Sequence, residues 1–166
     1  IQLERNKENE HGFTERNYPF NLSIRCGRLL LSACGGSDLY QYGTDASKLK
    51  HVALKYSGLV VHHAVESSLG TFLVCFTSWG HASDCNCTST YCLNKRLTDS
   101  GVLEVGDDGK LLHTFISSHR YGSPKLNVPV YLAIDSEDRA IVADSHNNRI
   151  VLLGADLDAE KVEQVL

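Results

Sequence analysis

The chain has 166 residues, of which 42% are hydrophobic and 22% are charged, and this composition is typical of a globular protein with one sizeable core. Its net charge of -4 at pH 7 argues against a surface that binds nucleic acid. No apolar run approaches the roughly 18 residues that a membrane-spanning helix requires. We therefore expect neither a nucleic acid nor a membrane among the partners of this protein.

Residues 1–17 are polar and charged, and we expect them to form an N-terminal tail or an edge strand beside a single domain that spans residues 18–166. The first patterned stretch, residues 19–42, reads PFNLSIRCGRLLLSACGGSDLYQY. Its three short apolar runs are separated by turn-forming Gly, Ser and Asp residues. This pattern predicts antiparallel strands with short connections.

The same order of runs and turns returns in residues 61–76 and continues in residues 101–115. We interpret these two stretches as one unit that a Cys-rich insertion, residues 78–100, divides between its second and third strands. Leu22 of the first unit precedes Ala64 of the second by about 42 residues, near the period expected of propeller blades. Connections that emerge at the edge of a blade are where such folds usually place binding functions.

The third unit, residues 128–153, reads VPVYLAIDSEDRAIVADSHNNRIVLL. Three apolar runs are separated by two short polar stretches, DSEDR and DSHNN, so no helix of ordinary length fits between them and a meander of strands is predicted. Leu132 aligns with Ala64, and the longer spacing between these two is explained by the insertion. We expect the C-terminal segment, residues 156–166, to be the fourth strand of this unit rather than a helix.

The third unit resembles the NHL repeat, a family of β-propeller blades. The residues that carry the resemblance are Pro129, Asp135, Asp144, Asn147 or Asn148, and Arg149. Residues 19–42 match less well, because Arg25 replaces the first Asp and Ala33-Cys34 stands in place of Ala-Asp. The resemblance implies an all-β chain with about three four-stranded blades.

The resemblance also implies a blade-locking network in which a carboxylate accepts hydrogen bonds from loop amides and a guanidinium. Its members would be Asp144, Asn147, Asn148 and Arg149. A closed ring needs at least about four blades, and an open arc of three would expose two apolar flanks. We therefore expect a second copy of the chain, or another fragment of the same precursor, to complete a ring of about six blades. A fourth blade built from the N-terminal segment and the insertion is the alternative.

Six cysteines favour a disulfide framework and an extracellular location; they are Cys26, Cys34, Cys75, Cys85, Cys87 and Cys92. Cys85 or Cys87 is expected to pair with Cys92, the remaining one with Cys75 or Cys34, and Cys26 could face Cys34 across a hairpin. Asn21 and Asn86 begin glycosylation sequons. The chain contains no Met, so we interpret it as a mature or trimmed product or an incomplete sequence.

The sequence patterns for a metal site or a catalytic site are weaker than those for disulfides. His81, Cys85, Cys87 and Cys92 could form a Cys₃His zinc site, but a single residue between Cys85 and Cys87 is unfavourable spacing. His62 and His63 are expected to point to opposite faces of a strand, where they cannot share an ion.

No nucleophile elbow is present. The sequence therefore favours a secreted, non-enzymatic propeller that needs no cofactor and serves as a binding or structural building block, with an extracellular protein or glycan as a further ligand. The alternative is a metal-dependent secreted hydrolase or lyase that holds calcium or zinc in its channel.

Overall fold

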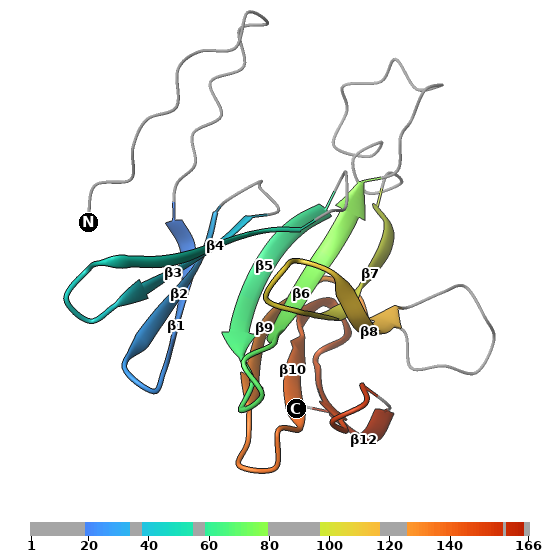
Figure 1. Cartoon of the computed structure of the whole chain (residues 1–166). Helices are drawn as coiled ribbons and strands as arrows, with labels where there is room; N and C mark the ends of the chain where they lie inside the picture. Colours follow the sequence, from blue (N-terminus) through green and yellow to red (C-terminus); the bar gives the residue numbers. More distant parts are fainter. Residues whose placement is uncertain are drawn as a thin grey trace, which may run out of the picture.

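The computed structural model describes residues 19–33, 38–54, 59–79, 97–116, 126–157 and 159–164. These residues form twelve β-strands and one 3₁₀ helix, η1 (Ser145–Asn147), as Figure 1 shows. None of the helical structure in this described part has the length and apolarity that a membrane crossing requires. The N-terminal segment and most of the Cys-rich insertion lie outside the described residues.

The strands form three four-stranded antiparallel sheets, each a meander in chain order. The first sheet contains β1 (Pro19–Arg25), β2 (Arg28–Ala33), β3 (Asp38–Gly43) and β4 (Lys48–Ala53). The second contains β5 (Leu59–Glu66), β6 (Phe72–Trp79), β7 (Leu97–Val105) and β8 (Leu111–Ile116). The third contains β9 (Pro129–Ile134), β10 (Ala140–Asp144), β11 (Arg149–Leu153) and β12 (Ala159–Gln164).

The three sheets are successive propeller blades, here named blade 1, blade 2 and blade 3. Their first strands, β1, β5 and β9, are neighbours and form an inner row from which the other strands extend outwards (Figure 1). The all-β expectation is confirmed, and the C-terminal segment forms strand β12 as predicted. The insertion separates β6 from β7, the second and third strands of blade 2.

Five hairpins share one turn geometry, in which the fourth of five turn residues has a positive φ. The residues at this position are Ala46, Gly70, Gly109, Asp138 and Leu157, and the turns are closed by backbone hydrogen bonds such as Gly70 N to Ser67 O (3.3 Å) and Gly109 N to Gly106 O (3.0 Å). Left-handed backbone is costly for residues other than glycine. The β1–β2 hairpin instead has a two-residue turn with positive φ at both Cys26 and Gly27, which suits the twist of its strands.

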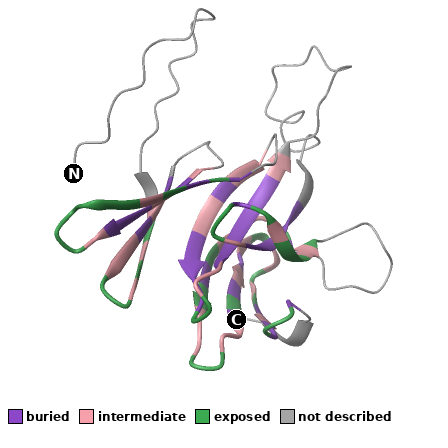
Figure 2. Cartoon of the chain, in the orientation of Figure 1, coloured by how far each residue is buried: buried purple, intermediate pink, exposed green. Residues whose placement is uncertain are grey.

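Two apolar cores hold the blades together, one on each face of blade 2. The core between blades 1 and 2 includes Leu39, Phe72 and Val74. The core between blades 2 and 3 includes Leu73 and Val142. Alternation along each strand sends successive side chains to opposite cores, so blade 2 is buried on both faces, whereas each core covers one face of blade 1 or blade 3. Figure 2 shows many buried residues in the central strands of blade 2.

A substitution of Gly109 tests the contact between the β7–β8 turn of blade 2 and strand β4 of blade 1. Gly109 has φ +76°, and a Cβ built there would lie 2.3 Å from Ala53 O. Gly109→Ala is therefore expected to lower the free energy of unfolding by about 2–3 kcal/mol, from left-handed strain plus the backbone clash. Gly70→Ala is the matched control, because Gly70 has φ +78° but open space around it, and it should cost about 1 kcal/mol. Equal losses in denaturant titrations would contradict the contact.

Candidate functional site

Side chains of the inner row connect each blade to the next. The Asn21 side-chain amide of β1 donates a hydrogen bond to His62 O of β5. One blade further on, Leu132 N of β9 donates to His63 Nδ1 at 3.3 Å, and the ring of Tyr131 packs edge-on against His63 with 5.7 Å between centroids. The backbones of adjacent inner strands are thus joined through side chains at equivalent positions of the repeat.

His62 and His63 do not alternate as the sequence predicts. The pairing of β5 with β6 shifts between Val61 and His63, and this bulge leaves His62 without a direct partner on β6. His62 Nε2 lies 2.9 Å from Thr77 Oγ1, while His63 pairs with Cys75. Thr77 and Cys75 are two residues apart and share the face towards blade 3, so both imidazoles reach that side and the expectation of opposite faces is wrong.

Burial lowers the pKa of both histidines below the ordinary value of 6.5. For His63, contacts with the backbones of Leu132 and Leu22 oppose this effect without reversing it. Because His63 Nδ1 accepts a hydrogen bond from Leu132 N, its proton resides on Nε2 in the neutral ring. The inner row is therefore uncharged at these positions near neutral pH.

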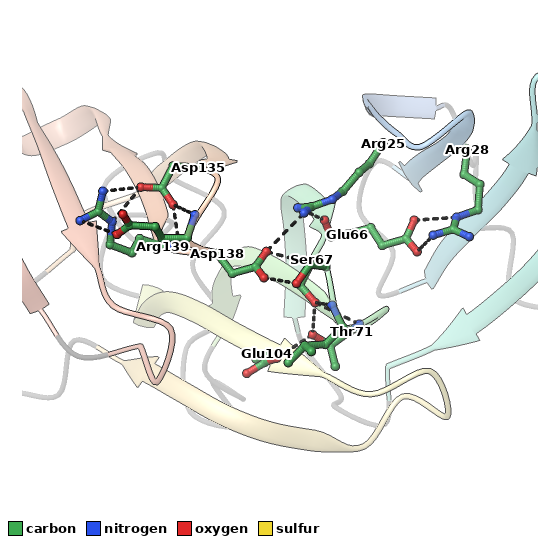
Figure 3. A network of polar contacts seen from close by, with 12 residues as sticks. Arg25, Arg28, Glu66, Ser67, Thr71, Glu104, Asp135, Asp138 and Arg139 are labelled. Atoms are coloured by element: carbon green, nitrogen blue, oxygen red, sulfur yellow. Dashed lines mark hydrogen bonds and ion pairs between the residues drawn. The ribbon is translucent and has the colours of Figure 1, made fainter.

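The ends of the three inner strands meet in a polar network (Figure 3). Arg25 Nη1 donates to Glu66 O at 3.0 Å, and Arg25 Nη2 lies 3.4 Å from Asp138 Oδ1. Asp138 also accepts hydrogen bonds from the backbone N–H of Ser68 at 3.0 Å and from its hydroxyl, which hold the pKa of this carboxyl below its usual value. One turn from each blade thus contributes to a single set of contacts.

Glu66 is the buried centre of the contact between blades 1 and 2. Arg28 binds its carboxylate with two bonds, Nε–Oε2 at 3.1 Å and Nη2–Oε1 at 2.5 Å, and Gln41 Nε2 donates to Oε2 at 2.8 Å. These groups line a pocket of about 440 Å³, together with Lys50 and Asp107, whose Nζ and Oδ2 are 2.8 Å apart. Each charge in the pocket has an opposite charge as partner, so the arrangement stabilises the blade interface without leaving an acid or base available.

A second buried carboxylate, Glu104, is satisfied within blade 2. Thr71 Oγ1 donates to its Oε1 at 2.6 Å, and His113 Nδ1 lies 2.6 Å from its Oε2. The hydrogen bond to Glu104 raises the pKa of His113 above its ordinary value. Neither Glu66 nor Glu104 was recognised in the sequence, because their partners lie up to 38 residues away.

Three of the four residues of the predicted blade-locking network contact one another through their side chains. The Asp144 side chain is fully buried and accepts hydrogen bonds from Arg149 Nε at 2.6 Å, Asn147 Nδ2 at 2.8 Å and Asn127 N at 2.5 Å. Asn148 contributes through its left-handed backbone, whose N–H bonds Ser145 O at 3.2 Å. These bonds fix the β10–β11 connection and the chain that enters β9.

Of the six cysteines, the structure describes two, and both are free thiols. Cys75 is buried in the core between blades 2 and 3, and burial raises its pKa to about 12. Cys26 is exposed in the β1–β2 turn, and strand β2 separates it from Ala33 by roughly 20 Å. Cys34, the partner predicted for Cys26, lies outside the described residues.

The glycosylation and zinc candidates lie partly within and partly outside the described residues. Asn21 lies in the contact with blade 2, where its side-chain nitrogen donates to His62 O, and its glycosylation stays a prediction. Asn86 and the zinc candidates lie outside the described residues; the latter are His81, Cys85, Cys87 and Cys92. Within the described ranges no three His, Cys, Asp or Glu side chains are grouped as metal ligands.

The outer faces of blades 1 and 3 form two exposed apolar surfaces. The blade 1 flank consists of Leu22, Ile24, Leu29, Leu31 and Tyr40, which strand register places on the face away from blade 2. The blade 3 flank consists of Ala133, Ile141, Ile150 and Leu152, placed likewise away from blade 2, together with Tyr131, whose exposed ring also touches His63 at the edge of blade 2. Ile24 is 67% exposed and Tyr131 57% exposed, whereas the apolar side chains on both faces of blade 2, such as Val74 and Leu73, are buried in the two cores.

No family model matches the chain, and no curated protein is similar to it at a significant level. Among solved structures it is similar to a protein of unknown function from Bacteroides caccae, with a TM-score of 0.51, 13% identity, and coverage of 95% of this chain and 48% of that one. It also resembles virginiamycin B lyase from Staphylococcus aureus, with a TM-score of 0.46, 12% identity, and coverage of 90% and 56%.

A third solved structure, a streptogramin B lyase, gives a TM-score of 0.46 and 11% identity, with coverage of 91% of this chain and 56% of that one. The chain spans about half the length of these solved structures. At this level of identity the likeness concerns the fold alone.

Asp144 tests whether the buried network holds blade 3. Asp144→Ala would remove a fully buried acceptor from the donors of Asn127, Asn147 and Arg149, and the free energy of unfolding is expected to fall by about 3–5 kcal/mol. Asp107→Ala is the control, since Asp107 is paired with Lys50 but is largely exposed, and such pairs contribute little. Urea unfolding of both variants measures the difference. Similar midpoints for the two would show that the Asp144 network does not stabilise the fold.

Proposed function

We propose that this protein is a secreted, non-enzymatic propeller segment of the NHL type, which acts as a structural and binding building block in an extracellular assembly. The observation that carries the proposal is the pair of apolar flanks. Soluble proteins rarely leave large contiguous apolar surfaces exposed unless these surfaces bind a partner. The flanks fit further blades, supplied by a second chain or by another segment of the same precursor.

The equivalence of the flanks to the buried faces supports blades as the partner. Within the chain, each blade packs an apolar face on its neighbour, and the same kinds of side chains line the faces of blade 2 and the two flanks. A blade that docked on either flank would bury Ile24 or Tyr131 as the cores already bury Val74 and Leu132. Burial of one such side chain contributes roughly 1.5–3 kcal/mol.

The polar groups support a non-enzymatic role. Glu66 and Glu104 are bound by partners from within the chain, and Asp144 accepts three hydrogen bonds. A general acid or base must reach a substrate proton with a suitable pKa, whereas these carboxylates join strands and turns. The hydrogen bonds of these three carboxylates are those of a structural protein.

Secretion rests on the sequence. The even number of cysteines and the sequon at Asn86 are typical of a chain that folds in an oxidising compartment. The two free thiols at Cys26 and Cys75 leave an even set of four for disulfides; they are Cys34, Cys85, Cys87 and Cys92. The match of residues 129–153 to the NHL pattern, with its Asp144 network, supports the assignment to that type of blade.

Assembly can be measured directly. The purified chain is expected to form a species of at least twice the mass of one chain, or to expose apolar surface that binds a hydrophobic dye, since two flanks cannot both remain in water at low cost. Light scattering over a range of concentrations, with dye fluorescence as a parallel readout, measures both. A well-folded monomer that stays monomeric at high concentration and binds no dye would contradict the proposal.

Thiol titration tests the oxidised state. In the unreduced protein, denaturation is expected to reveal two thiols, whereas only Cys26 should react in the native state, because Cys75 is buried and its pKa is raised to about 12. The Cys75→Ala variant identifies its own signal by the loss of one thiol after denaturation. Six reactive thiols in unreduced protein from a secreting host would remove the case for an extracellular scaffold held by disulfides.

A further inference from the structure

We infer that the blade 3 flank is the docking surface for the blade 1 flank of a second copy of this chain, and that two copies joined in this way at both ends close into one ring. The inference rests on the proposed function and names the partner and the pairing of its flanks. It follows from the contacts that blades 1, 2 and 3 already make with one another.

The two flanks correspond to the two sides of the interface between successive blades. Ala64 of blade 2 and Leu132 of blade 3 occupy equivalent positions, and each is buried against the preceding blade. Leu22 is the equivalent residue of blade 1, and it is 51% exposed, because the described residues form no blade that precedes blade 1. The blade 1 flank is therefore the face that receives a preceding blade, and the blade 3 flank is the face that receives a following one.

Side chains of the inner strands also show which blade follows which. At the equivalent position of blade 1, Asn21 donates to His62 O on the inner strand of blade 2. At that position of blade 2, His63 accepts from Leu132 N on the inner strand of blade 3. Each side chain thus bonds the backbone of the following inner strand. Tyr131 occupies this position in blade 3, where its ring packs edge-on against His63 but stays 57% exposed, so a following blade would cover it.

The direction of the inner strands determines which flanks can pair. The ends of β1 and β5 and the turn that follows β9 meet through Arg25, Glu66, Ser68 and Asp138, so the three inner strands run the same way (Figure 3). A following blade must keep this direction. Pairing of blade 3 with blade 1 of another copy does so, whereas pairing two copies of one flank about a two-fold axis either reverses the inner strands or places an inner strand beside an outer one.

A second copy provides both required surfaces at once. When the blade 3 flank of one copy covers the blade 1 flank of the other, a two-fold axis through the channel makes the second contact identical to the first. Each copy contributes three blades, so no apolar flank remains exposed. This arrangement continues the established blade 1–blade 2 and blade 2–blade 3 interfaces around the ring.

The experiment uses one charged substitution on each flank. Leu22→Asp alters the blade 1 flank, Ile150→Asp alters the blade 3 flank, and Leu69→Asp is the control, because Leu69 is highly exposed in the β5–β6 turn and lies on neither flank. Wild type and the Leu69 variant are expected to form dimers with the same dissociation constant. Each flank variant should weaken dimerisation by at least about 30-fold, the effect of losing one central contact. Circular dichroism confirms that each variant retains its fold.

An equimolar mixture of the two flank variants gives the decisive result. In a mixed ring, one interface combines the two unaltered flanks and the other combines the two altered ones. The mixed dimer is therefore expected to be tighter than either variant alone, as measured by sedimentation of differently labelled chains. If Ile150→Asp dimerises like wild type, or if mixing restores nothing, the pairing of opposite flanks is overturned while assembly itself stands.

Three further outcomes distinguish the closed ring from its alternatives. A mass that grows with concentration beyond two chains would overturn the closed ring, because it shows that opposite flanks join without closure. A wild-type chain that remains monomeric and binds no hydrophobic dye would overturn the proposed function together with this inference. Dimerisation unaffected by any of the three substitutions would place the contact on another surface and overturn the inference alone.

Discussion

Each sheet in this molecule has two faces that must be buried, and the rest of the structure depends on that constraint. Blade 2 meets it, because Phe72 and Val74 pack towards blade 1 while Leu73 and Cys75 pack towards blade 3. A single meander of four strands could not remain folded alone, since it would expose one or both apolar faces. Stability is therefore a property of neighbouring blades, and within the described part of the chain blades 1 and 3 each have a neighbour on one side only.

Apolar faces and polar contacts have different roles in this arrangement. The cores supply most of the favourable free energy but are compatible with small rotations of one blade against another. The polar groups fix the orientation, because Arg28 meets Glu66 and Ser68 meets Asp138 only when the inner strands end together. Their net contribution to stability is modest, so their main effect is to make one relative placement of the blades unique.

The fold could be predicted from the sequence because it repeats, whereas the contacts between repeats could not. Short runs around Leu22, Ala64 and Leu132 identified three units, and the Asp144 network was visible since its members lie within a few residues. The Arg28–Glu66 pair joins distant segments and has no local pattern. The bulge at His62 breaks the two-residue period without any Gly or Pro to mark it, which is why alternation failed there.

The free energy of association favours two interfaces over one. Bringing two chains together costs an estimated 4–15 kcal/mol of translational and rotational freedom, and one flank contact must offset all of it. When a second, identical contact closes the ring, the two chains have already lost this freedom. The second contact therefore adds almost all of its own free energy to the stability of the dimer. Flanks with only a few well-exposed large side chains, such as Ile24 and Tyr131, can therefore be sufficient in a closed ring and insufficient in an open chain of copies. Two moderate contacts that close the ring can therefore stabilise the three-blade chain as well as one strong interface would.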